Sequence, residues 1–421
     1  MMNVIQLLPG ITLRCFPERR FKRGFLSLQF IRPMCREENA LNGLLPSVLL
    51  RGTRQCPDIR AVTARLDDLY GGAVGGSVRR IGDYQAVGLS AGFIDDRFAM
   101  TGDRVLEPML EFCSQLVLDP ALEDSLFRRD VVETEKKNLV ATIEASLNNK
   151  RQYAVLQLLK LMCREDTTGI PRLGEPEQVE AITPEALTCH YRKLLETSPM
   201  EIFYVGGAGP EQVAQVLRKT LSCLDRKPEA LPPQGPFRDG GNQWKQEEMP
   251  VNQGRLCLGF VTPITLRDDR VGAMKVCNGV LGGSMISKLF MVIREQLSLC
   301  YDIDSEYSGT KGILTVTAGV DSGNFDLVRE KVLEQLEACK AGRITEKELL
   351  AAKERHISAL KRVYDSGSGM EGYYMGTLLS GLNQTPEEAI ARIQEVTAEQ
   401  VAQAAATLRL HTEYYLKGVQ E

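Results

Sequence analysis

Histidine is scarce in this chain, and its scarcity limits the metal chemistry that we expect. The 421 residues include three histidines, His190, His356 and His411, which lie far apart in the sequence. Hydrolytic zinc sites draw their imidazole ligands from closely spaced positions, as in H-E-x-x-H or H-x-x-E-H. Neither motif is present. The sequence therefore argues against a conventional zinc hydrolase.

Three further shortages narrow the class of protein. The 11 cysteines include no C-x-x-C pair, so they predict neither a structural zinc site nor a disulfide framework and favour reduced thiols in a cytoplasmic protein. No run of about 18 apolar residues exists, so we expect no membrane-spanning helix. The 51 basic and 55 acidic residues give a net charge of −4, so neither nucleic acid nor an anionic membrane is expected as a partner.

Two local patterns suggest other chemistries but lack the context for them. Cys189 and His190 are adjacent, and neighbours on an amphipathic helix point in different directions, so we expect no Cys-His nucleophile. The glycine-rich residues 71–77 lack the G-K-[ST] ending of a phosphate loop and the strand-then-helix context of a dinucleotide site. Neither pattern predicts a catalytic or phosphate-binding function.

The order of elements repeats once along the chain, which indicates two copies of one α+β domain. The corresponding segments are residues 24–31 and 254–261, residues 91–94 and 318–321, and two helix starts at Thr183 and Thr397. A stretch rich in proline, glycine and polar residues predicts a linker between the copies. We therefore expect an N-terminal domain at residues 1–227, a linker at 228–245 and a C-terminal domain at 246–421.

Local patterns predict individual elements of the first copy. The opening residues 1–10 are interpreted as a first strand, because Pro9-Gly10 breaks their apolar run. Alternation predicts strands at residues 11–16 and 24–31, which we expect to pair with each other. Helical spacing predicts a helix at residues 58–70 that Asp58 caps and a long charged helix at residues 122–147.

Residues 281–301 form the most specific segment of the chain. Apolar residues recur there at helical spacing, and we expect them to face inward: Met285, Leu289, Val292 and Ile293. Lys288 and Glu295 are expected to face water. On pattern alone, Arg294 is a surface residue in a salt bridge and Tyr301 is a half-buried strand residue.

This segment resembles a family signature. The run G-G-S-M-x-S-K-L-F-x-x-I-R-E-x-x-x-L-x-Y is similar to the C-terminal half of the pitrilysin/insulinase metallopeptidases, and residues 169–191 resemble the pattern of their first half. The resemblance implies two homologous domains, each a mainly antiparallel sheet packed with helices, which face each other like a clam-shell around a chamber. It also implies that Arg294 and Tyr301 contact a peptide there.

The family's zinc motif is degenerate in this chain. Active members carry H-x-x-E-H on a first-domain helix that runs into a Lys/Arg-Gly-Thr landmark, here residues 51–53. Counting back from the landmark places Gly43 and Ser47 at the two histidine positions and Pro46 at the general base. None of these residues can replace the family residue, because glycine and proline have no ligating group and a neutral serine binds zinc poorly.

The distal zinc ligand of the family is missing as well. Residues 135–143 resemble the family's E-[KR]-x-x-[VL]-[VI]-x-E-[IV], and the ligand position in this pattern is Thr142. Glu135 retains the first acid of the pattern, although an acid on so charged a helix is also typical of a solvated or salt-bridging residue. The resemblance therefore implies no metal in this chain and zinc only in an active partner.

The resemblance implies a catalytically silent peptidase homologue that binds peptide in the inter-domain chamber. It pairs with an active insulinase-family homologue as a heterodimer, or with itself as a homodimer. The peptide would pair with a sheet edge, at the strand that leaves residues 71–77. Two alternatives remain: a scaffold or binding protein without proteolytic role, like the related core subunits of respiratory complexes, and a peptidase with an unconventional metal or nucleophile, built for example on Glu135 and Glu144.

Overall fold

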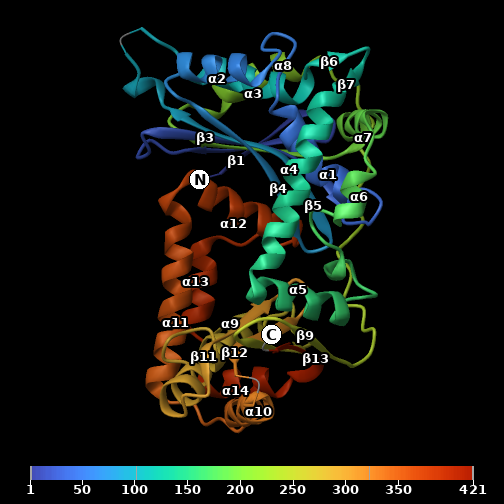
Figure 1. The fold of residues 1–421 in the computed structure, drawn as a ribbon. Coiled ribbons are helices and arrows are strands. Elements are labelled where there is room, and N and C mark those ends of the chain that lie inside the picture. Colours follow the sequence, from blue (N-terminus) through green and yellow to red (C-terminus); the bar gives the residue numbers. More distant parts are fainter. Residues whose placement is uncertain (1, 101, 322, 420–421) are drawn as a thin grey trace. The chain divides into compact units, whose positions relative to one another are not determined.

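The chain folds into two compact α+β units, each with one large sheet and packed helices (Figure 1). The computed structural model describes residues 2–100, 102–321 and 323–419. Unit 1 comprises Met1–Glu144, Ile170–Gln234 and Tyr364–Met375, and unit 2 comprises Ala145–Gly169, Gly235–Val363 and Gly376–Glu421. The predicted α+β class with two domains is confirmed.

The sheet of unit 1 has six strands in the order β1-β2-β8-β3-β5-β4. These strands are β1 (Asn3–Leu8), β2 (Ile11–Pro17), β3 (Arg23–Pro33), β4 (Ala73–Ile81), β5 (Tyr84–Ile94) and β8 (Met200–Gly206). The predicted pairing of β2 with β3 is wrong, because β8 lies between them, parallel to β2 and antiparallel to β3. Six of the seven residues of β8 are buried, and a strand so apolar needs a neighbour on both sides.

The sheet of unit 2 has five strands in the order β11-β12-β10-β13-β9. They are β9 (Gln243–Met249), β10 (Gly254–Val261), β11 (Cys300–Ser308), β12 (Ile313–Val320) and β13 (Arg409–Gly418). Read from the other end, this order repeats β2-β8-β3-β5-β4, including the single parallel pair at β9 and β13. The internal repeat that the sequence predicts is therefore present in the sheets.

The helices of unit 1 include three that pack on its sheet, α1 (Asn39–Leu49), α3 (Leu106–Leu118) and α8 (Pro210–Leu221). The others are α2 (Ile59–Asp68), α6 (Pro176–Glu180), α7 (Pro184–Thr197), most of α4 (Arg129–Asn148) and the short η1 (Asp96–Phe98). Asp58 caps α2, as expected, by accepting from the Ala61 amide. The charged helix begins at Arg129 and not at residue 122, because β6 (Leu122–Glu123) and β7 (Leu126–Phe127) form a small hairpin first.

The helices of unit 2 surround its sheet in the same way. They are α5 (Lys150–Met162), α9 (Val271–Leu281), α10 (Phe325–Lys340), α11 (Glu346–Lys361), α13 (Pro386–Gln394) and α14 (Ala398–Ala406), with the short turn η2 (Thr167–Gly169) and the π-helix η3 (Leu289–Gln296). The short turn η4 (Arg362–Asp365) belongs to unit 2 only up to Val363. Thr397 caps α14 as Thr183 caps α7, each by accepting an amide three residues on. No helix in the described part of the chain is long and apolar enough to cross a membrane.

The second face of each sheet is covered by a segment from the opposite half of the sequence. In unit 1 this segment is the start of α12 (Gly367–Leu379), where Glu371 pairs with Arg79 of β4. In unit 2 it is α5, whose Leu158 packs with Cys257 of β10. The compact units thus depart from the contiguous domains predicted at residues 1–227 and 246–421. Periodicity shows which side chains are apolar, and not which sheet they cover.

Candidate functional site

Helix α1, at the positions of the family's zinc motif, is a packed core helix. A Cβ atom added at Gly43 would lie 3.0 Å from the carbonyl oxygen of Leu173 and 3.2 Å from its Cα. A histidine at this position would therefore need the backbone at Leu173 to shift by a few tenths of an ångström. The space that a zinc ligand would need is filled by the chain itself.

The remaining motif positions are closed in a similar way. Pro46 lies inside α1 and is buried. A Cβ atom added at Gly76 of β4 would lie 2.9 Å from the Cβ of Pro46, so the helix and the strand approach as closely as glycine allows. Ser47 is half-buried. The side of α1 where a general base would project is thus occupied by the sheet.

His190 lies beside the motif positions and belongs to a buried polar network. The Nε2 atom of His190 lies 2.7 Å from Oδ1 of Asn42, and Asn42 Nδ2 donates to Gln85 Oε1 at 2.8 Å. Gln85 in turn donates to the carbonyl of Arg172 at 2.7 Å. Burial lowers the pKa of His190 to about 4, so the ring is neutral and donates from Nε2. This histidine joins α7 to α1, while the exposed Cys189 points elsewhere.

The acids of α4 are arranged for packing and not for metal binding. Glu135 is buried and accepts from Arg51 Nε at 2.6 Å and from Asn138 Nδ2 at 3.2 Å. Thr142 is exposed, and its hydroxyl donates to the carbonyl of Asn138 in its own helix. Within residues 2–100, 102–321 and 323–419, no group of three or more His, Cys, Asp or Glu side chains could hold a metal ion. The residues at the family's zinc positions do not fit a zinc ion.

The segment that carries the family signature in unit 2 folds as a π-helix. Residues Leu289–Gln296 form this helix, and the amide of Leu297 still donates to the carbonyl of Val292, five residues back. Leu289 and Ile293 are buried, as the spacing predicts. Two expectations are wrong: Met285 is 78% exposed, and Lys288 is buried, with Nζ 2.9 Å from Oε1 of Glu348. α-Helical periodicity predicts neither the wider turn of a π-helix nor the ion pair of Lys288 with Glu348, 60 residues away.

Rare backbone features follow one another in this segment. The π-helix is the first, and such helices are found frequently at functional sites. Ser298 then adopts a φ of 52°, which is uncommon for a residue with a side chain. Between Cys300 and Asp302 the register of β11 against β12 shifts, so Tyr301 is the extra residue of a bulge. Bulges redirect side chains near sites, and Tyr301 is 65% exposed and not half-buried.

Arg294 lies on the π-helix with its side chain 41% exposed. The guanidinium carbon lies 4.6 Å from the centre of the Phe290 ring, which is a cation–π contact. Its Nε is 3.8 Å from Oε1 of Glu295, a long contact that leaves the terminal nitrogens open. The predicted surface position is thus present, with only a weak salt bridge. Phe290 was missed by sequence reasoning, although its spacing of four residues from Arg294 indicates contact on a helix.

One edge of the unit 1 sheet is formed by β4, and the other by β1. The strand begins at Ala73, so most of the glycine-rich residues 71–77 belong to it and not to a loop. A Cβ atom added at Gly75 would meet no other atom within 4 Å. A glycine on an edge strand permits the close approach of another backbone.

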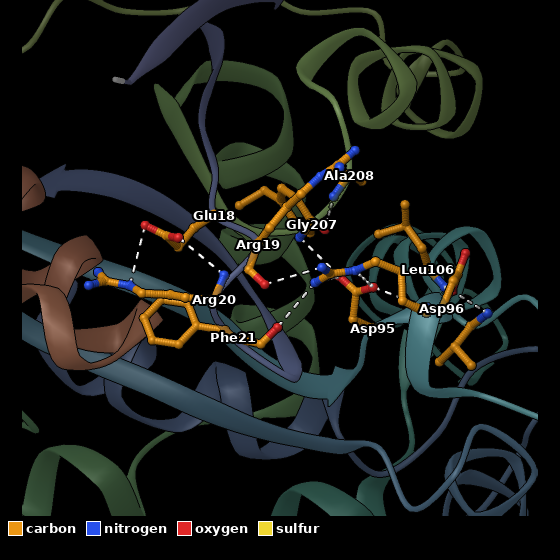
Figure 2. Close-up of polar contacts among 12 residues, drawn as sticks. Glu18, Arg19, Arg20, Phe21, Asp95, Asp96, Leu106, Gly207 and Ala208 are labelled. Atoms are coloured by element: carbon orange, nitrogen blue, oxygen red, sulfur yellow. Dashed lines mark hydrogen bonds and ion pairs between the residues drawn. The ribbon is translucent and has the colours of Figure 1, made fainter.

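A second polar cluster in unit 1 serves the scaffold (Figure 2). Asp95 pairs with Arg97 at 2.7 Å and accepts from the Gly207 amide at 3.0 Å. Arg97 also donates to the carbonyls of Arg19 and Phe21, which fastens the turn between β2 and β3 to the end of β5. Burial opposes ionisation of Asp95, but the hydrogen bonds from Arg97 prevail and lower its pKa. The cluster therefore holds loops together, because Asp95 and Arg97 are bonded to each other and to backbone groups.

Known proteins resemble this chain in sequence and in fold. Residues 181–355 match a family model described as "Peptidase M16 inactive domain". The chain is 29% identical over 413 residues to the "Probable inactive metalloprotease YmfF" of Bacillus subtilis, which covers 98% of this chain and 96% of that protein. It is also 29% identical over 250 residues to the "Uncharacterized zinc protease YmxG" of the same organism, covering 59% of this chain and 60% of that protein.

Solved structures share the fold along the whole chain. A conserved protein of Enterococcus faecalis is 26% identical with a TM-score of 0.91, covering 100% of this chain and 99% of that chain. A peptidase M16 inactive domain from Pseudomonas fluorescens has 18% identity and a TM-score of 0.82, again covering 100% and 99%, and this likeness shows the fold alone.

The fold and the filled motif define a class of proteins, the M16-type peptidase homologues without zinc ligands. The resemblance to the pitrilysin/insulinase metallopeptidases that the sequence predicts is confirmed by these comparisons. In sequence and fold this chain is similar to M16 peptidase homologues that are described as inactive, and we expect no catalytic activity from it alone.

Proposed function

We propose that this chain is the non-catalytic member of a peptidase pair. It binds peptide through Arg294 and Tyr301, and an active zinc-peptidase homologue carries out the cleavage. The observation that carries the proposal is the segment from Leu289 to Tyr301, where unusual backbone holds an open arginine and an exposed tyrosine. Strained backbone of this kind persists where the surrounding structure supports it, and it is concentrated at functional sites.

The pairing with an active homologue is supported by two observations. The positions that would bind zinc are filled by packing, and the described residues hold no group of three metal-binding side chains, which supports a separate chain as the source of hydrolysis. Bacillus subtilis holds one relative with inactive metalloprotease in its name and another with zinc protease in its name. The 11 free cysteines suit a reducing compartment, so we place the pair in the cytoplasm.

Main-chain pairing of the peptide with the β4 edge is the second part of the proposal. An edge strand presents unpaired backbone groups, and an added strand satisfies them. The open space where a Cβ would stand at Gly75 leaves the face of the edge strand uncrowded at this position.

The test is reconstitution with an H-x-x-E-H homologue from the same host. Peptide hydrolysis is measured for each chain alone and for the mixture, with Arg294→Ala and Tyr301→Ala in this chain. We expect each variant to assemble normally and to lower kcat/KM of the mixture by about tenfold. Arg343→Ala is the matched control, an exposed arginine elsewhere in unit 2. Unchanged cleavage by both site variants would contradict the assigned role.

A scaffold without proteolytic role is the second candidate. One chain of the solved complex III2 from Candida albicans shares the fold, with a TM-score of 0.77 and 16% identity over 99% of this chain. Co-purification from the native host separates the two candidates. An H-x-x-E-H homologue in the complex supports the peptidase pair, and a stable assembly without one supports the scaffold.

A further inference from the structure

We propose that the ligand of segment 285–301 is a peptide that presents an apolar side chain next to a carboxylate. The inference rests on the proposed peptide-binding function and adds the chemistry of the ligand. The apolar part would contact Met285, Met291, Leu297 and Tyr301, which we call the apolar surface, and the carboxylate would bind Arg294.

The apolar surface stands out from the rest of the described chain. Four of the fourteen large hydrophobic side chains that are exposed in the described residues lie within this one short segment. Such residues scattered singly are ordinary, whereas a contiguous exposed patch marks an interaction site, and we infer from their closeness in sequence that these four form one. Two of the four are methionines, whose unbranched side chains adapt to ligands of different shape.

Arg294 is positioned to bind a planar anion such as a carboxylate. A cation–π contact with the Phe290 ring, 4.6 Å from its centre, restrains the guanidinium. Among the residues that the structure describes, Arg294 makes no hydrogen bond, and its ion pair with Glu295 is long, with Nε 3.8 Å from Oε1. A carboxylate accepts two parallel hydrogen bonds from such a fork, which a single ammonium group cannot supply.

Two acids beside the segment are already paired with arginines. Asp302 accepts from Arg255 Nη1 at 2.6 and 2.7 Å, and Asp304 lies 2.7 Å from Nη2 of Arg151. Both carboxylates are therefore neutralised within unit 2. Arg294 remains as the cation with open donors, so charge complementarity points to an acidic peptide.

The first experiment measures fluorescence anisotropy of labelled peptides with the full-length chain. One sequence is made with Asp or Asn beside its Leu, and each version with a free or an amidated C-terminus. We expect loss of one carboxylate to weaken binding about tenfold or more. The sensitive position tells whether a side chain or the C-terminus binds Arg294. Arg294→Lys should abolish most of the difference, and Glu295→Gln should strengthen binding of every acidic peptide.

The second experiment tests the apolar contact. Met291→Ser and Leu297→Ser should each weaken the Leu peptide several-fold and leave a Ser-substituted peptide unchanged. Leu350→Ser, on the exposed face of α11, is the matched control and should change neither.

The outcomes separate this inference from the function on which it rests. Equal binding of acidic, amidated and Ser-substituted peptides would overturn the ligand chemistry while peptide binding stood. Absence of binding by every peptide, together with unchanged cleavage in the reconstituted pair, would overturn the proposed function itself.

Discussion

The residues at the family motif are packed in unit 1, whereas Arg294 and Tyr301 of the motif in unit 2 are exposed. In unit 1 the helix α1 is sealed, with Leu173 against Gly43 and β4 against Pro46. In unit 2 the segment from Leu289 keeps rare backbone and leaves Arg294 and Tyr301 open. The positions of the zinc motif in unit 1 are packed as core, whereas the segment in unit 2 has a conformation that packing alone does not require.

The largest effect is expected from an attempt to restore the zinc motif. Gly43→His should lower the free energy of unfolding by about 3 kcal/mol or more, because its side chain meets the backbone of Leu173. The triple variant with Pro46→Glu and Ser47→His should bind no zinc. Denaturant unfolding and metal analysis measure the two results.

Ser47→His alone is the matched control for the restored motif. Ser47 is half-buried, so its replacement should cost less than about 1 kcal/mol. A stable triple variant with stoichiometric zinc would show that unit 1 is open after all.

A second large effect is expected where α12 covers the sheet of unit 1. Arg79→Ala leaves the carboxylate of Glu371, which is 4% exposed, without its cation, and should cost about 3 kcal/mol. The double variant Arg79→Met with Glu371→Leu should be milder, because it removes both charges. Denaturant unfolding of the full chain measures both. Equal costs would show that the lost packing, and not the charge, matters.

Acid should weaken unit 1 through His190. Its pKa in the folded chain is about 4, below the ordinary 6.5, so the unfolded chain binds more protons between these values. Stability is therefore full above pH 6.5 and falls by about 3 kcal/mol as pH decreases to 4. Glu38, whose pKa is about 2 because hydrogen bonds from Arg32 and Lys193 outweigh its burial, adds a loss below pH 4.5.

The control for the acid effect is His190→Gln, which keeps a donor and cannot titrate. Its unfolding midpoint, followed by circular dichroism, should vary less between pH 6.5 and 4.5. An unchanged slope would assign the acid effect to other groups.

The smallest effect is expected in unit 2. Arg294→Ala should change the free energy of unfolding by less than about 0.5 kcal/mol, because the side chain makes no strong contact. The measurement is denaturant unfolding beside wild type and Arg343→Ala. A loss above 1 kcal/mol would make Arg294 a structural residue and would remove the contrast between the units.

Much of this fold could be predicted from local patterns. The strand alternation, the threonine caps at Thr183 and Thr397 and the buried Leu289 and Ile293 follow from side chains that act on their own neighbourhood. The degenerate zinc motif was also readable, because missing ligands are a property of residue type. The sequence therefore sufficed to predict an inactive homologue.

The misses share one physical cause, a partner distant in sequence. β8 separates β2 from β3 because its apolar residues need the sheet interior. Lys288 is buried because Glu348 lies beside it. The exchange of α5 and the start of α12 between units depends on the surfaces of two sheets, which no local window contains.

The measurement that tests the central claim most directly is zinc content and peptide hydrolysis of the purified chain, alone and mixed with an H-x-x-E-H homologue from the same host. We predict no zinc and no cleavage for the chain alone, with cleavage gained or increased in the mixture and reduced by Arg294→Ala. Stoichiometric zinc and chelator-sensitive cleavage by the chain alone would contradict the account.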